Sequence, residues 1–167
     1  MRTDMLQELE RIVRLAGGMV REAHDIEQVT TEKNGAADLV TKYDVAVQGF
    51  LKRELLELLP EADFFGEEGE HAALTRPWTF IVDPIDGTTN FVRRLHYSNI
   101  SVALAHDGQV EYAVVYDPFA DQLFSAQKDC GAFCSGLPIH VSDKDMAHAV
   151  FLCGSTIYDR SLTEQNF

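Results

Sequence analysis

The chain has 167 residues and a formal net charge of −13, with 27 Asp and Glu against 14 Lys and Arg. Its 46% hydrophobic and 25% charged residues are typical of a globular domain that buries a core, and they exclude a disordered or fibrous chain. An acidic chain without a dense Lys/Arg cluster lacks the cations that nucleic-acid binding requires. We therefore expect one folded domain with no nucleic-acid partner, in which an anionic ligand needs a metal bridge.

The hydrophobic pattern predicts neither a secretory leader nor a membrane span. Charged residues such as Asp4, Glu8 and Arg11 interrupt the first twenty positions, and no apolar run is long enough to cross a bilayer. The three cysteines are an odd number, which suits a reducing compartment better than a disulfide framework. We therefore expect a cytoplasmic protein with no membrane partner.

The first predicted element is a helix. Apolar residues recur every three or four positions from Met5 to Ala23, which predicts a helix that ends near His24. Residues 25–37 are polar and lack periodicity, which predicts a connecting loop.

A second helix is predicted from Lys42 to Leu59. Thr41 and Asp44 are spaced as a capping box at its start, and Pro60 ends it. We expect the two helices to lie on the same face of a sheet.

The rest of the chain is predicted to form strands. Trp78 to Val82 is a nearly continuous apolar run, as expected of a strand buried on both faces, and it stops at Asp83-Pro84. Alternating apolar residues on both sides of Asp107-Gly108 predict an antiparallel hairpin. Further short strands are expected at Gln122–Ala126, Ile139–Val141 and Val150–Cys153. Two helices followed by a meander indicate an α+β fold.

Acidic residues gather at the ends of three predicted elements: Asp38 with Asp44, Glu67 with Glu68, and Asp83 with Asp86. Two carboxylates about 4 Å apart repel each other by about 4 kcal/mol at an effective dielectric constant of 20, so a shared site needs a cation or a proton. Hard oxygen ligands of this kind suit Mg²⁺. The pattern predicts a magnesium site if the three clusters converge.

The segment 83–91, Asp-Pro-Ile-Asp-Gly-Thr-Thr-Asn-Phe, carries the most specific pattern. Pro84 cannot continue the strand, Gly87 permits a positive φ, and Thr88 can begin a helical turn. Such a turn places carboxylates for a metal beside N–H groups for a phosphate. An isolated Asp-Gly-Thr is more simply a solvent-exposed turn, but the preceding apolar strand and the upstream acidic pair favour a site.

Three motifs, at residues 38–44, 66–68 and 83–91, resemble the inositol monophosphatase family. Residues 114–118 and 131–133 are also similar to the hairpin region of that family. The resemblance implies a layered sandwich of helices and sheets and a Mg²⁺-dependent, lithium-sensitive hydrolysis of small phosphomonoesters. It also implies a homodimer.

The resemblance further implies a set of metal ligands. Glu67, Asp83 and the carbonyl of Ile85 would hold one ion, and Asp83 and Asp86 would share a second.

The same resemblance implies roles in catalysis and in phosphate binding. Glu67 and Thr88 would orient the attacking water, with Asp44 hydrogen-bonded to the Thr88 hydroxyl. Asp86 and the amides of Gly87 and Thr88 would bind the substrate phosphate.

Glu68 and Lys33 are lesser candidates, and simpler interpretations exist for both. Lys33 lies in a polar loop where a solvated lysine is ordinary, and Glu68 can face solvent. For Asp44, the capping of a helix alone explains an acidic residue at that position.

The chain departs from the family in one respect. Family members continue into a second lobe with a Trp-Asp motif, whereas Trp78 is the single tryptophan and Thr79 follows it. We therefore expect residues 1–167 to form the N-terminal lobe alone, either as a fragment of a longer enzyme or as a truncated protein with weakened activity.

The expected substrate is inositol monophosphate or a similar polyol phosphate. Alternatives are a sugar-bisphosphate or nucleotide phosphatase of the same superfamily, or a non-catalytic binding or regulatory protein. A haloacid dehalogenase-type phosphatase is excluded, because Pro84 occupies the position where that chemistry needs a nucleophilic aspartate.

Overall fold

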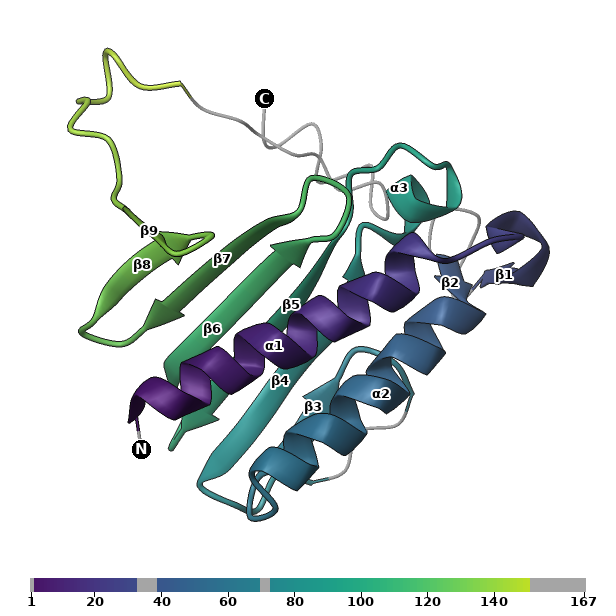
Figure 1. The fold of residues 1–167 in the computed structure, drawn as a ribbon, viewed down its shortest axis with the longest axis horizontal. Helices are drawn as coiled ribbons and strands as arrows, with labels where there is room; N and C mark the ends of the chain where they lie inside the picture. Colours follow the sequence, from purple (N-terminus) through teal and green to yellow (C-terminus); the bar gives the residue numbers. More distant parts are fainter. Residues whose placement is uncertain (1, 33–38, 70–72, 151–167) are drawn as a thin grey trace, which may run out of the picture.

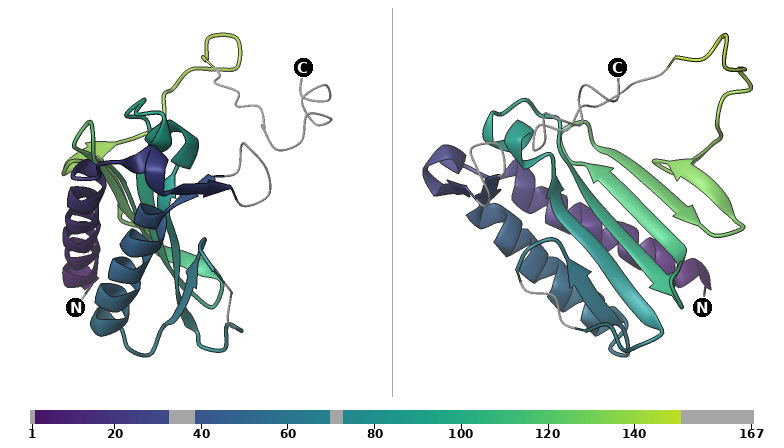
Figure 2. Two further views of the ribbon diagram at one scale, coloured as in Figure 1. Left: turned by 90° about the vertical axis from the view of Figure 1, so that its right-hand side faces the viewer. Right: turned by 180° about the vertical axis from the view of Figure 1, so that it is seen from behind.

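The computed structural model describes residues 2–32, 39–69 and 73–150. In this part of the chain a seven-stranded sheet forms the centre, and two long helices lie side by side on one of its faces (Figures 1 and 2). The helices are α1 (Arg2–Arg21), α2 (Lys42–Leu58), the short α3 (Thr88–Val92) and a 3-10 turn, η1 (Ile26–Val29). The strands are β1 (Thr30–Glu32), β2 (Leu39–Thr41), β3 (Asp63–Gly66), β4 (Trp78–Asp86), β5 (Asn99–His106), β6 (Gln109–Asp117), β7 (Gln122–Gln127), β8 (Gly131–Cys134) and β9 (Leu137–Ile139).

The large sheet runs in the order β3-β4-β5-β6-β7-β8-β9. Only β3 and β4 pair in parallel among its neighbours, and every other pair is antiparallel. The predicted hairpin across Asp107-Gly108 is formed by β5 and β6, and β7 matches the strand predicted from Gln122. The fold is therefore α+β, as the sequence predicts.

The first predicted helix is confirmed as α1, which packs along β5, β6 and β7. Its apolar stripe is fully buried, at Leu9, Ile12, Val13, Ala16 and Val20. These side chains contribute to one core, which lies between the sheet and the two helices.

The second predicted helix is confirmed as α2, together with its capping box. The Thr41 hydroxyl accepts hydrogen bonds from the backbone N–H groups of Tyr43 and Asp44, and Asp44 Oδ2 accepts one from the Thr41 N–H at 2.7 Å. α2 lies over β4 beside α1, so the prediction that both helices cover one face of a sheet is also correct (Figure 2).

β4 differs from its prediction in two ways. Ile81 is 42% exposed, because the helices cover only the face that Phe80 and Val82 line, so the strand is not buried on both faces. The strand also does not stop at Asp83 but continues to Asp86, with a shift of register against β5 between these two residues. The second correction decides the geometry of the candidate site.

Several short elements were not predicted. The predicted loop at 25–37 contains η1 and β1, and β1 forms a small antiparallel sheet with β2. β3 and β8 are also unpredicted. β9 covers Leu137–Ile139, so it overlaps the strand predicted at Ile139–Val141 only at Ile139. The strand predicted at Val150–Cys153 lies, apart from Val150, outside the described residues. Of the helices described, none has both the length and the apolar character that a membrane crossing requires.

Candidate functional site

Parallel pairing of β3 and β4 brings two of the acidic segments together. Gly66 is the register partner of Val82, so the next residue of each strand, Glu67 and Asp83, follows at the same end of the sheet. The Glu67 N–H donates a hydrogen bond to the Val82 carbonyl at 3.0 Å, which continues the ladder beyond the end of β3. Residues 16 positions apart in sequence therefore meet at the same end of the sheet.

A β-bulge brings the third acidic residue to the same side. Asp83 pairs with Ser101 and Asp86 with Asn99, so three steps along β4 match two steps along β5. Side chains three residues apart on a regular strand point to opposite faces, whereas the extra residue of a bulge restores the same face. Pro84, which cannot donate to the ladder, lies inside the bulge. Asp83 and Asp86 therefore share the face that is turned away from α1 and α2.

Asp83 is the electrostatic centre of this cluster. Its Oδ1 atom is buried and has no hydrogen-bond partner among the described residues. Burial, followed by the charge of Glu67, a side-chain hydrogen bond with Glu67 and the charge of Asp86, together raise the pKa of Asp83 to about 8. An unpartnered carboxylate oxygen between two other acidic groups is an environment that a cation would stabilise.

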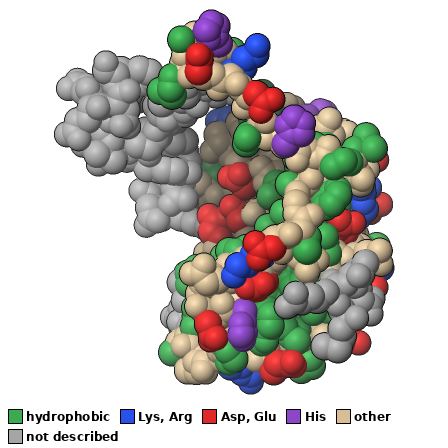
Figure 3. All heavy atoms as spheres, turned by 90° about the vertical axis from the view of Figure 1, so that its left-hand side faces the viewer, with side chains coloured by type: hydrophobic (Ala, Val, Ile, Leu, Met, Phe, Trp, Pro, Cys, Tyr) green, Lys and Arg blue, Asp and Glu red, His purple; other side chains and the backbone are tan. Residues whose placement is uncertain are grey.

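The donor set fits Mg²⁺ by its chemistry, since carboxylate and carbonyl oxygens are the ligands that this ion prefers. Within the described ranges, no group of three or more His, Cys, Asp or Glu side chains is arranged so that it could hold a metal ion. The fit therefore depends on the orphan oxygen of Asp83 and on its acidic neighbours. Figure 3 shows that acidic side chains also gather in a hollow of the molecular surface.

Asp44 and Thr88 form a hydrogen-bonded pair next to this cluster. Asp44 is only 1% exposed, and its Oδ1 accepts a hydrogen bond from the Thr88 hydroxyl at 3.2 Å. Burial raises the pKa of Asp44, while hydrogen bonds from Thr41 and Thr88 act in the opposite direction. Asp44 thus caps α2 with one oxygen and contacts Thr88 with the other, so its structural and functional interpretations are compatible.

The Thr88 hydroxyl has a choice of two acceptors. It lies 3.0 Å from the Ile85 carbonyl and 3.2 Å from Asp44 Oδ1, and its single proton can serve only one of them at a time. Gly87 precedes it in the left-handed conformation, with φ 82°, where a side chain would also meet the Tyr97 carbonyl at 3.1 Å. This glycine therefore allows the sharp turn from β4 into α3.

Two residues that sequence analysis did not single out contact the site. Gln48 of α2 donates from Nε2 to the Glu68 carbonyl at 2.7 Å and accepts from the Glu68 N–H at 2.8 Å. Asn99 of β5 donates from Nδ2 to Asp86 Oδ2 at 3.0 Å. Gln48 lies one helical turn after Asp44, and this i, i+4 spacing is the one sequence signal that could have pointed to it. No comparable signal marks Asn99.

A cavity of about 550 Å³ opens beside Asp86. Polar side chains from α3, from the loop after it and from β5 to β7 surround it, above two apolar residues of the sheet. The lining consists of Asp86, Gly87, Asn90, Tyr97, Ser98, Asn99, Val115, Asp117, Gln122 and Phe124. The cavity and the acidic cluster therefore share Asp86.

The two lesser candidates have different outcomes. The Glu68 backbone is held by Gln48, which fixes the segment just after Glu67. Lys33 and Asp38 lie outside the described residues.

The Inositol monophosphatase family model matches residues 1–166 of the chain. Inositol monophosphatase 1 of Rattus norvegicus is 38% identical over 138 residues, which is 80% of this chain and 50% of the relative. Inositol monophosphatase 2 of Homo sapiens is 37% identical over 142 residues, which is 82% of this chain and 49% of the relative. The chain thus spans about half the length of the curated relatives that it matches.

Solved structures agree with the sequence comparison. Extragenic suppressor protein suhB from Bartonella henselae superposes with a TM-score of 0.78 and 29% identity, over 84% of this chain and 55% of that protein. The IMPase of Thermotoga maritima superposes with a TM-score of 0.74 and 30% identity, over 84% of this chain and 54% of that protein. With a family model that matches almost every residue and a fold that these structures share, the chain belongs to the inositol monophosphatase family.

Proposed function

We propose that this chain carries the metal- and phosphate-binding part of a Mg²⁺-dependent phosphomonoesterase that acts on a small polyol phosphate such as inositol monophosphate. The observation that supports the proposal best is the buried, unpartnered oxygen of Asp83 beside Glu67 and Asp86. Related proteins add support. An IMPase/NADP phosphatase with 28% identity is complexed with Mg²⁺ and phosphate, and a staphylococcal IMPase-I, also with 28% identity, is complexed with products.

In this proposal the acidic cluster provides the metal ligands. Glu67, Asp83 and the carbonyl of Ile85 would hold one Mg²⁺, and Asp83 and Asp86 would hold a second. Bound Mg²⁺ would neutralise the charge of the phosphate and lower the pKa of a coordinated water. Lithium sensitivity belongs to the same proposal, since a staphylococcal inositol monophosphatase-1 forms an inhibitory complex in LiCl.

The chain's own residues would then position the water and the phosphate. When the Thr88 hydroxyl donates its proton to Asp44, its oxygen can accept a hydrogen bond from a water that approaches the phosphate. Glu67 accepts a second hydrogen bond from that water, so that the lone pair of the water points toward the phosphorus atom. Asp86 and the amides of Gly87 and Thr88, at the turn into α3, contact the phosphorylated substrate.

The remaining expectations extend this proposal to the whole protein. We propose that residues 1–167 correspond to the N-terminal lobe of the family's fold, because the chain matches about half of its relatives. We further propose that the protein is a cytoplasmic homodimer whose partner is a small phosphorylated substrate. Gel filtration with light scattering tests the homodimer directly.

One related structure favours a second substrate class. The IMPase/NADP phosphatase has a TM-score of 0.68 to this chain, which makes a nucleotide phosphate the alternative to a polyol phosphate. A sugar bisphosphate is a further alternative substrate within the same enzyme superfamily. A non-catalytic binding or regulatory protein is the third alternative, because the described acidic side chains do not form a group of three or more that could hold a metal ion.

Calorimetry on the chain tests the proposed metal site. We expect Mg²⁺ to bind in the micromolar to millimolar range in the presence of inorganic phosphate, and Asp83→Asn to abolish this binding because it removes the bridging carboxylate. Asp107→Asn is the matched control. It removes the same charge at an exposed turn with φ 49°, a conformation that Asn tolerates. Unchanged Mg²⁺ binding in Asp83→Asn would refute the proposal.

Phosphate release from a substrate panel separates the substrate classes. Turnover of inositol monophosphate supports the polyol class, and turnover of NADP or fructose bisphosphate alone supports the second candidate. Mg²⁺ binding without turnover of any substrate supports the binding or regulatory alternative.

A further inference from the structure

Asn99 begins β5 and is the direct cross-strand partner of Asp86. Its Nδ2 atom donates a hydrogen bond to Asp86 Oδ2 at 3.0 Å. Asp86 is exposed, so its carboxylate could otherwise occupy several rotamers. We propose that Asn99 is a positioning residue, which holds the Asp86 carboxylate in the orientation that the metal and phosphate site requires. The inference rests on the function proposed above.

The bulge in β4 is what brings the two side chains together. Asp83 of β4 pairs with Ser101 of β5, and Asn99 lies two residues before Ser101. Without a bulge, Asn99 would therefore pair with the residue two positions after Asp83, which is Ile85. The extra residue places Asp86 opposite Asn99 instead. The contact therefore depends on the same irregularity that brings Asp83 and Asp86 to one face.

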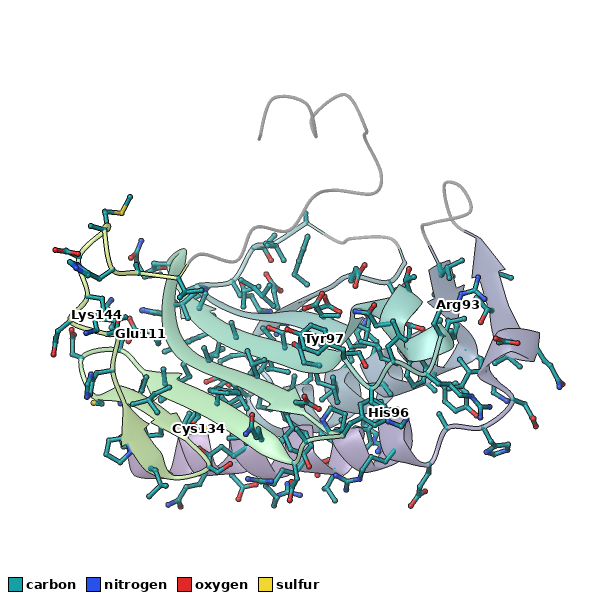
Figure 4. The ribbon with its side chains drawn as sticks, turned by 90° about the horizontal axis from the view of Figure 1, so that it is seen from above. Arg93, His96, Tyr97, Glu111, Cys134 and Lys144 are labelled. Carbon is teal, nitrogen blue, oxygen red and sulfur yellow. The ribbon has the colours of Figure 1, made fainter. Side chains whose placement is uncertain are left out.

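The loop before β5 fixes the position of Asn99. Asn90 of α3 donates from Nδ2 to the Tyr97 carbonyl at 2.8 Å, two residues before Asn99. The ring of His96 stacks on Phe119, with centroids 4.7 Å apart and an interplanar angle of 14°. Figure 4 shows His96 and Tyr97 next to the short helix at this end of the sheet. Asn99 is thus presented from a segment that is tied both to α3 and to the turn after β6.

An amide suits this role for a chemical reason. It restrains one carboxylate oxygen without neutralising the negative charge, whereas Lys or Arg in the same place would compete with a cation. The second oxygen of Asp86 remains available to a ligand. Partners of this kind behind a metal ligand typically change metal affinity by about 10- to 100-fold when they are removed.

The affinity of the protein for Mn²⁺, measured in the presence of inorganic phosphate, tests the inference. The electron paramagnetic resonance signal of free Mn²⁺ reports how much of the ion is bound. Asn99→Leu keeps the size of the side chain and removes the donor, so we expect Mn²⁺ affinity to fall about 10-fold or more. Asn99→Gln keeps an amide on a longer arm and should recover part of the affinity. Gln109→Leu is the matched control, since it makes the same chemical change on the partner of His106, at the other end of β5.

A second measurement needs no metal. In the metal-free protein, the side-chain amide resonances of Asn99 should shift in Asp86→Ala and remain unchanged in Asp107→Asn. If the Asn99 side-chain resonances do not shift in Asp86→Ala, the contact between the two side chains is refuted.

The Mn²⁺ measurement separates the inference from the proposed function. Equal Mn²⁺ affinities in the wild type and Asn99→Leu would overturn the inference and leave the proposed function in place, whereas a wild type that does not bind Mn²⁺ would overturn both. An affinity in Asn99→Gln as low as in Asn99→Leu would also contradict a role for the amide donor.

Discussion

Asp83 combines two conditions that are unfavourable for a carboxylate. It is half-buried, with one oxygen that lacks a hydrogen-bond partner in the described structure, and it lies beside the charges of Glu67 and Asp86. Burial and like charge both favour the protonated form, which is why the pKa of Asp83 rises to about 8. The ionised form of Asp83 therefore destabilises the folded protein without a cation, whereas a bound cation would stabilise it.

This shift predicts how stability depends on pH in the metal-free protein. Between about pH 4 and pH 8 the unfolded chain has released the Asp83 proton while the folded chain retains it, so the free energy of unfolding decreases as pH rises through this window. Asp83→Asn cannot ionise and should lose less stability over the same range. Melting temperatures measured in EDTA across the window check this. Asp107→Asn should follow the wild type, and a wild-type curve parallel to that of Asp83→Asn would contradict the prediction.

The candidate residues could be predicted where local sequence carries their signal. Asp83, Asp86 and Gly87 come after the apolar run of residues 78–82, so their place near the end of a strand was readable from the chain. Gln48 and Asn99 were not predicted, because their partners lie 20 and 13 residues away and are reached only through the packing of α2 and the register of β5. Contacts of this kind leave no local pattern.

At the scale of elements, Gln48 connects α2 to the end of β3. Its side-chain amide forms two hydrogen bonds with the Glu68 backbone, and its carbonyl end lies over Gly66, where a Cβ atom would come within 2.4 Å of Oε1. A side chain at position 66 would therefore displace the Gln48 amide and the Phe64 ring. The segment that carries Glu67 is held from both sides, by β4 and by α2.

Gln48→Ala should destabilise the protein by about 1–3 kcal/mol, since it removes two hydrogen bonds to part-buried backbone groups. Gln7→Ala is the matched control, because Gln7 is an exposed residue of α1. Urea denaturation measures both. Equal stability of the two variants would show that the contacts with Glu68 contribute nothing to the fold.

Neighbouring glycines in α1 offer a second test. A Cβ atom at Gly17 would lie 2.3 Å from the ring of Tyr116, whereas one at Gly18 would meet nothing within 4 Å. The Tyr116 ring cannot easily move, because its hydroxyl donates to Asp121 at 2.7 Å and accepts from Arg21 at 2.8 Å.

We therefore expect Gly17→Ala to destabilise the protein by about 1–3 kcal/mol through overpacking. Gly18→Ala should instead stabilise it by about 0.5–1 kcal/mol through helix propensity. Thermal or urea denaturation of the two variants gives the comparison, and similar effects of both would refute the close approach of α1 and β6.

The long elements were predictable and the short ones were not. α1 and α2 have regular apolar stripes, and the hairpin has its Asp107-Gly108 turn, so hydrophobic periodicity and turn chemistry sufficed. β3 has only four residues, Asp63 to Gly66, too few for an alternation to be visible. Its pairing with β4 is a property of the tertiary structure, and that pairing assembles the site.

For the whole molecule, the sheet has two unlike faces. α1 and α2 cover one face and bury the core, while Phe65, Ile81 and Phe124 are 36%, 42% and 40% exposed. The sequence predicted burial of β4 on both faces because an apolar run does not reveal which neighbours are present. Asp83 lies on the same side of β4 as Ile81, so the candidate site opens on the face that the helices leave uncovered.

The position of β3 at the edge of the sheet has a further consequence. Segments with few packed neighbours open first in native-state fluctuations, and among the described strands β3 is paired along only one side. An ion held jointly by Glu67 and Asp83 would cross-link β3 to β4. Metal binding would then slow amide hydrogen exchange throughout β3, and local opening of β3 would in turn lower the affinity for the ion.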